Sequence, residues 1–272
     1  MTKNYIHMPF TWKLKPSSAG ALLGLNKYKT RTQALAEAWR DRKPALFKQT
    51  MRSLNVQGTI REVARNAIGE SDALCRAIEF GVNSQSKAGR DKAMSDIKQE
   101  AYAGVQTRSR RAFANRIVDE ARSEMYKATG IIQEQNGMNQ AAKKQGKTFE
   151  EGNKRFYRLD IPGAPYQGVL WGLIDGFDHE TNTIIEHKQR QNRLFYKIPV
   201  YERIQCFIYM KMLGVHRVQL IQTFDGQQKE HIILWDENEW EKIYQGLVQC
   251  VRDLNRTITD PQWCRQLVQS LC

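Results

Sequence analysis

The sequence predicts an α/β fold of the α+β type, in which a central mixed β-sheet of about four or five strands is flanked by helices. Two observations predict it. Apolar residues recur at helical spacing over residues 17–142, and segments rich in β-branched and aromatic residues, separated by turn residues, begin near residue 149. The chain has 272 residues, 41% of them hydrophobic, which is enough for a buried core and excludes wholesale disorder.

The first half of the chain carries the helical pattern. Leu35, Ala38 and Trp39, for example, follow i, i+3, i+4 spacing and would form one apolar helix face. Residues 87–126 are expected to form one or two long polar helices, which pack as a lobe or project from the body. We therefore expect a mainly helical lobe over residues 1–129, followed by a second unit over residues 130–272.

The second half alternates between strands and helices. Strands are predicted over residues 155–161, 168–177, 183–188, 218–223 and 230–234, and helices over residues 199–213 and 237–255. The polar turn DHETN (178–182) would join two of these strands into an antiparallel hairpin.

Positive charge is concentrated in the N-terminal half. Residues 1–147 contain 27 Lys and Arg against 13 Asp and Glu, whereas residues 148–272 contain 15 against 16. The net charge of +13 therefore lies entirely in the first half, where it favours a polyanionic partner such as nucleic acid. Solvated lysine-rich faces are the alternative interpretation, so charge nominates a partner and names no reaction.

The five cysteines are scattered and never spaced as a CxxC pair, which favours neither a disulfide framework nor a zinc site. A reducing intracellular compartment, nucleus or cytoplasm, is therefore expected. The N-terminal 16 residues contain no apolar run long enough for a signal peptide, and no run of about eighteen apolar residues predicts a membrane span. We expect a soluble protein without a membrane partner.

Charged residues gather on the predicted hairpin, within WGLIDGFDHETNTIIEHKQR (171–190). Side chains alternate faces along a strand, so Glu186 and Lys188 would share one face, and Asp175 would lie beside Glu186 across the pair. Two carboxylates without thiolate ligands suit Mg²⁺, for which Mn²⁺ would substitute, and such an ion lowers the pKa of a bound water. Lys188 would orient that water or neutralise charge on a phosphate. The backbone carbonyl of His187 would be an additional metal ligand.

A solvated hairpin with an ordinary cross-strand salt bridge is the alternative interpretation. It is disfavoured because Glu186 and Lys188 lie in a strongly apolar strand, where unpaired charge is costly. A second D/E-x-K sequence, Asp96-Ile97-Lys98, lies in a helical context, where residues i and i+2 point in different directions. We therefore select the hairpin as the candidate site.

The runs GLIDGFD (172–178) and TIIEHKQR (183–190), followed by YERIQCFIYM (201–210), resemble the PD-(D/E)XK nucleases of the lambda-exonuclease and YqaJ-like branch, versions of which occur in phages and large DNA viruses. The resemblance implies a restriction-endonuclease-like core over residues 130–272, to which the opening helix would also belong. It implies that Asp175, Glu186 and Lys188 are catalytic and that the two carboxylates bind the metal.

A downstream helix carries the family's Q-h-x-x-Y pattern, here Gln205 to Tyr209. Tyr201, Gln205 and Tyr209 share one helix face. Gln205 is a candidate catalytic residue that would support the catalytic strand or contact DNA. Tyr209 is a candidate DNA contact, with core packing as the favoured interpretation of both tyrosines.

Two further segments extend the resemblance. ATGIIQEQNG (128–137) resembles the family's first motif and nominates Glu134 as a catalytic residue and metal ligand, although Thr129 stands where the family often has Arg. KLKPSSAGALLGLNKYKT (13–30) is similar to the opening element, which implies that Lys15 and Ser18 bind DNA near its 5′ end. Helix capping by the serine, with solvated lysines, is the alternative.

Two arginines, Arg190 and Arg193, follow the catalytic strand in HKQRQNRLF (187–195). Arginine there would hold a DNA phosphate bidentately and guide the backbone toward the metal. A solvated strand exit is an equally weighted alternative.

The resemblance implies Mg²⁺-dependent 5′-to-3′ digestion of double-stranded DNA ends in recombination, repair or viral DNA processing. It also implies, for some relatives, a ring-shaped homotrimer and a partner protein that anneals single strands. Two rival interpretations stay open. One is an endonuclease acting on RNA, flaps or branched DNA with the same site, and the other is a non-catalytic DNA-binding protein that keeps the fold.

Overall fold

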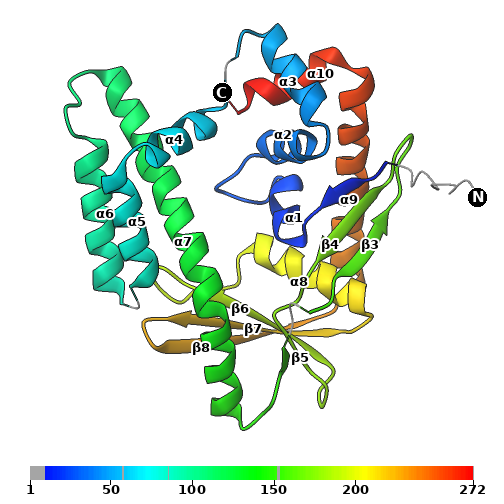
Figure 1. Cartoon of the computed structure of the whole chain (residues 1–272). Coiled ribbons are helices and arrows are strands. Elements are labelled where there is room, and N and C mark those ends of the chain that lie inside the picture. Colours follow the sequence, from blue (N-terminus) through cyan, green and yellow to red (C-terminus); the bar gives the residue numbers. More distant parts are fainter. Residues whose placement is uncertain (1–9, 57, 85, 152–153, 272) are drawn as a thin grey trace, which may run out of the picture.

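The computed structural model describes residues 10–56, 58–84, 86–151 and 154–271. Residues 1–9, where we expected no targeting signal, lie outside the described residues. Figure 1 shows a body of sheets and helices, with a helical lobe beside it and one long helix running between the two. No helix in the described part of the chain is long and apolar enough to cross a membrane.

Among the described residues, five strands form a mixed sheet, as the sequence predicts, although residues 150–151 were not expected as a strand and the strand expected over residues 155–161 lies in another sheet. In sheet order they are β2 (Glu150–Glu151), β5 (Gly176–Asp178), β6 (Thr183–Gln189), β7 (Arg217–Phe224) and β8 (Gln227–Leu234). β6 and β7 run parallel, and the other neighbours are antiparallel. Parallel pairing requires a crossover, which is supplied by helix α8 (Val200–Leu213). β6 is the third of the five strands and so lies at the centre of the sheet. Its residues 183–187 are buried.

The single strand expected over residues 168–177 is wrong. The chain forms β4 (Gly168–Gly172) and then leaves that sheet before β5 begins. β4 pairs with β1 (Trp12–Leu14) and β3 (Tyr157–Ile161) in a separate three-stranded sheet. Gly172 marks the break, because a Cβ there would lie 2.8 Å from the Pro16 ring and 3.1 Å from the Tyr209 ring. The two helices that carry these rings therefore approach the backbone closely at the point where the chain changes sheets.

The main hydrophobic core lies between these sheets and the helices of the body (Figure 1). Its largest fully buried side chains include Trp12, Trp39 and Phe207. These helices are α8, α1 (Pro16–Leu22), α2 (Arg31–Arg42), α3 (Pro44–Ser53), α9 (Glu237–Thr259) and α10 (Pro261–Gln269). The opening segment thus packs into the same core as the strands.

A second core fills the helical lobe, where Ile97 and Met125 are fully buried. The lobe consists of α4 (Ile60–Gly69), α5 (Asp72–Asn83), α6 (Lys87–Ala101) and the first part of α7 (Arg108–Gln145). α6 and α7 account for the long polar helices predicted over residues 87–126. α7 is continuous through residues 129 and 130, where we placed the division of the chain, and its second part packs Met138 and Ala141 against the sheet.

Asp178 secures the turn between β5 and β6. Its buried carboxylate accepts hydrogen bonds from Lys147 Nζ at 2.6 Å and from Thr181 Oγ1 at 2.7 Å. Burial alone would raise the pKa of Asp178, but these bonds lower it to about 2, below the ordinary value of 3.8. The stabilisation is therefore complete above about pH 4 and is lost as the pH falls toward 2.

We expect Asp178→Asn to lower the free energy of unfolding by about 2 kcal/mol at pH 7 and to remove this acid dependence. Urea unfolding between pH 2 and 7 measures both effects.

Candidate active site

The candidate site is built on β6, a strand whose side chains alternate between two helices. Glu186 and Lys188 face α8, and Gln205 on α8 donates from Nε2 to Glu186 Oε1 at 2.8 Å. His187 faces α7 on the opposite side of the sheet, where its ring lies against Gly137. The predicted sharing of one face by Glu186 and Lys188 is confirmed.

Asp175 immediately precedes β5 and lies beside Glu186. The β5–β6 register pairs Gly176 with Ile185, so Asp175 continues the ladder opposite Glu186. Asp175 Oδ2 accepts a hydrogen bond from the backbone N–H of His187 at 2.8 Å. In an antiparallel ladder a residue's N–H and C=O point to the same neighbour, so the His187 carbonyl also lies on the Asp175 side. The His187 carbonyl oxygen, which we predicted as a metal ligand, therefore points to the same side of β6 as the Asp175 carboxylate.

Glu186 is deeply buried, with 1% of its surface exposed. Its Oε1 accepts hydrogen bonds from Lys188 Nζ and from Gln205 Nε2. Its Oε2 is buried and has no hydrogen-bond partner among the described residues. An unpartnered buried carboxylate oxygen is costly, and it is the kind of atom that a hard divalent cation binds.

The electrostatics of the three residues are strongly linked. Burial raises the pKa of Asp175 well above its ordinary value, and the charge of Glu186 raises it further. Burial also raises the pKa of Glu186, against the opposing charge of Lys188. Burial acts to lower the pKa of Lys188, but the charges of Glu186 and Asp175 outweigh it and raise that pKa. Two carboxylates thus repel each other in a poorly hydrated space with one ammonium, and an additional cation would relieve this repulsion.

Glu134 is not gathered into this pair. It lies on α7, which covers the opposite face of β6 from Glu186, although its charge raises the pKa of both Asp175 and Glu186. Within the described residues, no three His, Cys, Asp or Glu side chains form a group that could hold a metal ion. The two carboxylates and the carbonyl suit Mg²⁺ or Mn²⁺ by donor type. The role of Glu134 as a further ligand stays a prediction.

His187 is a packing residue of the α7 interface. Its ring is buried and lies 2.9 Å, through Nε2, from Thr223 Oγ1. Burial, with the charges of Lys188 and Arg190, lowers the pKa of His187 to about 4, so the ring is neutral near pH 7. The His187 side chain therefore contributes to the packing of α7 against the sheet.

Gly137 allows α7 to approach the His187 ring. A Cβ at position 137 would lie 2.0 Å from His187 Nε2, whereas a Cβ at Gly130 would meet nothing within 4 Å. We expect Gly137→Ala to lower the free energy of unfolding by about 1–3 kcal/mol, because the ring or the helix must shift. The matched control Gly130→Ala should raise it by about 0.5–1 kcal/mol. Urea unfolding measures both, and similar changes in the two variants would contradict this packing.

The DNA-binding role predicted for Arg190 is corrected by the structure. Arg190 is buried, and its guanidinium donates to both carboxylate oxygens of Glu202, at 2.5 and 2.7 Å. Its Nε donates to Gln222 Oε1 at 2.6 Å, and the group lies over the Phe195 ring. These donors are directed into the protein, so Arg190 joins β6, β7 and α8 instead of binding phosphate. Glu202 and Gln222 were not predicted as partners of Arg190, because nothing in their local sequence pattern identifies that role.

The other predicted DNA contacts differ in exposure. Tyr209 is only 5% exposed and packs in the main core, so the packing interpretation is confirmed and the predicted DNA contact is wrong. Arg193 is exposed in the segment between β6 and α8, and its role stays a prediction. Lys15 is exposed, and Ser18 lies inside α1 without capping it, so the capping alternative fails while phosphate binding stays a prediction.

Comparisons with known proteins give similarities of structure only. No family model matches the sequence, and no curated protein matches it. An alkaline exonuclease from Laribacter hongkongensis is similar over 72% of this chain and 93% of its own, with 14% identity and a TM-score of 0.37. A phage-related exonuclease from Haemophilus somnus is similar over 73% of this chain and 95% of its own, with 13% identity and a TM-score of 0.34. At this level of similarity, we base the functional assignment on the chain's own residues.

Proposed function

We propose that this protein is a metal-dependent nuclease that hydrolyses DNA phosphodiester bonds at Asp175, Glu186 and Lys188. The observation that supports the proposal is the convergence of these residues, with the buried Glu186 Oε2 left without a partner among the described residues. A buried carboxylate oxygen without a partner is costly, and a bound divalent cation would satisfy it. The strongly basic first half of the chain suits a polyanionic substrate.

In the proposed reaction, water oxygen bonds to the phosphorus, the bond from phosphorus to one sugar oxygen breaks, and the water proton passes to the leaving oxygen. Asp175, Glu186 and the His187 carbonyl would hold Mg²⁺, which when bound supplies an activated water and neutralises phosphate charge. Gln205 fixes the rotamer of Glu186 through its 2.8 Å hydrogen bond. Lys188 places a positive charge beside the same carboxylate, where it would stabilise the negative charge that develops on the phosphate.

The resemblance in the sequence favours an exonuclease that digests duplex ends in the 5′-to-3′ direction, in recombination, repair or viral DNA processing. The assay compares linear duplexes labelled at the 5′ or the 3′ end with closed circles, each with Mg²⁺ and with EDTA. We expect loss of the linear substrate with Mg²⁺ only, and release of the 5′ label first. Cleavage of circles would favour the endonuclease alternative, and a folded protein that cuts neither substrate would overturn the proposal.

A non-catalytic DNA-binding protein is the second candidate. The basic lobe alone would support it, but the retained Asp, Glu and Lys set argues against it. Salt-sensitive DNA binding without any calorimetric Mn²⁺ binding would favour this candidate.

A further inference from the structure

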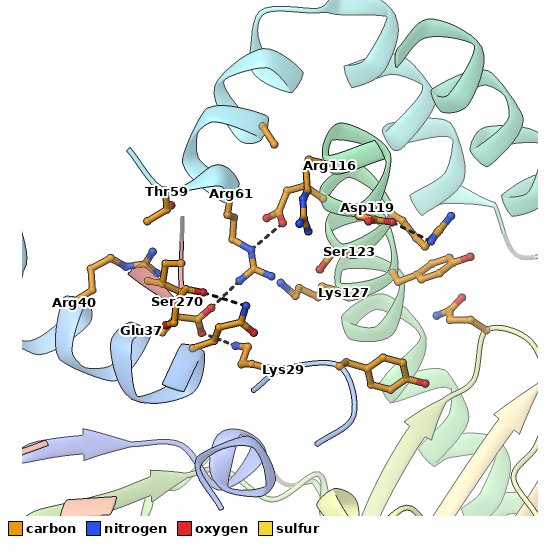
Figure 2. Close-up of a pocket in the computed structure, with 18 of the residues that line it drawn as sticks. Lys29, Glu37, Arg40, Thr59, Arg61, Arg116, Asp119, Ser123, Lys127 and Ser270 are labelled. Atoms are coloured by element: carbon orange, nitrogen blue, oxygen red, sulfur yellow. Dashed lines mark hydrogen bonds and ion pairs between the residues drawn. The ribbon is translucent and has the colours of Figure 1, made fainter. Parts of the chain in front are cut away.

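A charged cleft of about 870 Å³ lies between the helical lobe and the body (Figure 2). On the lobe side it is lined by α4 and α7. On the body side it is lined by α2, by the segment before α2, by residues 189 and 191 at the end of β6, and by residues 270 and 271 after α10. The sequence patterns did not predict this cleft, because its lining comes from segments that are far apart in the chain.

Positive charge exceeds negative charge in the cleft. Six cationic residues line it against three acidic ones, Glu37, Asp119 and Glu120. Glu37 is bound by Lys29 and Arg61, and Arg61 also bonds Glu120 (Figure 2). Arg122 pairs with Asp119 and Arg40 with Asp41, so Arg116 and Lys127 are the cleft cations without an ion pair among the described residues. The cationic residues are Lys29, Arg40, Arg61, Arg116, Arg122 and Lys127.

Lys127 shows this excess most clearly. It points toward Arg61 across the cleft (Figure 2), and it forms no ion pair within the described ranges. Burial lowers the pKa of Lys127, and the charge of Arg61 lowers it further. Arg116, three turns earlier on α7, also lines the cleft and likewise has no ion pair within those ranges. An anion between Lys127 and Arg61 would relieve the repulsion between these two side chains.

Aromatic side chains accompany the cations. Tyr28 lines the cleft with 71% of its surface exposed, and Tyr126 lines it from α7. Proteins that hold single-stranded nucleic acid combine a basic groove for the backbone with aromatic rings on which bases stack. The volume falls within the range of about 300–1,000 Å³ that is typical of small-ligand sites.

Several residues that line the cleft are close in the fold to residues of the candidate active site. Lys127 and Glu134 are seven residues apart on one face of α7, which is about 10 Å along the helix axis. Gln189, which lines the cleft, follows Lys188 directly on β6. The Tyr28 ring lies 6.4 Å from the ring of Tyr201, which is one turn before Gln205 on α8.

We propose that this cleft binds a single-stranded segment of DNA and directs its backbone to the Asp175–Glu186–Lys188 site. The direction of the strand rests on the proposed nuclease function, whereas binding in the cleft does not require cleavage. In an end-processing reaction, the strand to be cut would separate from its partner before it enters the cleft. Arg116 and Lys127 would contact phosphates, and Tyr28 would stack on a base.

The test measures binding of a short labelled single-stranded oligodeoxynucleotide by fluorescence anisotropy in EDTA, so that no cleavage can occur. The variant is Arg116→Ala with Lys127→Ala. The control is Lys92→Ala with Lys98→Ala, which removes the same charge from α6 of the same lobe, outside the cleft. We expect the cleft variant to bind at least about tenfold more weakly. Its slope of log K against log salt should fall by about 1.4, since each lost single-strand contact removes about 0.7.

Stacking is tested separately at Tyr28, where alanine should weaken binding about tenfold and phenylalanine should preserve it. Equal losses of affinity in the cleft and control variants would overturn the proposal. It would also be overturned if a blunt duplex bound as tightly as the single strand and lost as much affinity in the cleft variant. Because metal is absent, a failure of the nuclease proposal leaves this binding result unaffected. If the cleft substitutions leave the rate of DNA cleavage unchanged, this inference is overturned and the nuclease proposal is not.

Discussion

Lys188→Ala should reduce the rate of DNA cleavage by about 10²- to 10³-fold, since it removes the only ammonium found beside Glu186 in the described structure. Mn²⁺ binding should persist, because both carboxylates remain. The measurement is the initial rate of hydrolysis of a linear duplex with saturating Mg²⁺. Circular dichroism establishes that the variant is folded.

The matched control is Lys98→Ala, the lysine of the second D/E-x-K sequence. Lys98 is an exposed residue of α6, and alanine there should leave the cleavage rate within about twofold of the unsubstituted protein. Full activity in Lys188→Ala would remove this lysine from the mechanism. An equal loss in both variants would mean that lobe charge, and not the hairpin, limits the rate.

Arg190→Ala should destabilise the protein by about 3–5 kcal/mol, because it leaves the buried carboxylate of Glu202 without its bidentate partner. The control Arg193→Ala, at an exposed position three residues later, should change stability by less than about 0.5 kcal/mol. Urea denaturation measures both free energies of unfolding. A small effect at Arg190, together with a large loss of DNA affinity, would restore the phosphate-binding role that we had predicted for it.

Patterns local to one element were sufficient to predict most of the fold. The apolar run in β6 and the helical spacing in α8 and α9 identified these elements from their own residues. The break between β4 and β5 was not predictable in the same way. At this break, rings of α1 and α8 approach Gly172 closely, and these contacts join distant parts of the sequence.

In the candidate site, too, local patterns predicted some features, whereas others depend on contacts between distant parts of the chain. Alternation along β6 correctly placed Glu186 and Lys188 on one face, and by the same rule Arg190 shares that face. Because α8 covers that face, the alternation along β6 could have predicted that Arg190 is buried. It could not have predicted that its partner is Glu202. The position of Glu134 depends on which face of the sheet α7 covers. Its local pattern contains no information about that choice.

Calorimetric titration with Mn²⁺ tests the central claim most directly, because that claim is that Asp175 and Glu186 bind a catalytic divalent ion. We expect the unsubstituted protein to bind Mn²⁺, and Asp175→Asn and Glu186→Gln, each folded by circular dichroism, to lose both this binding and DNA cleavage. Unchanged Mn²⁺ binding in either variant, or cleavage that persists in EDTA, would contradict the account.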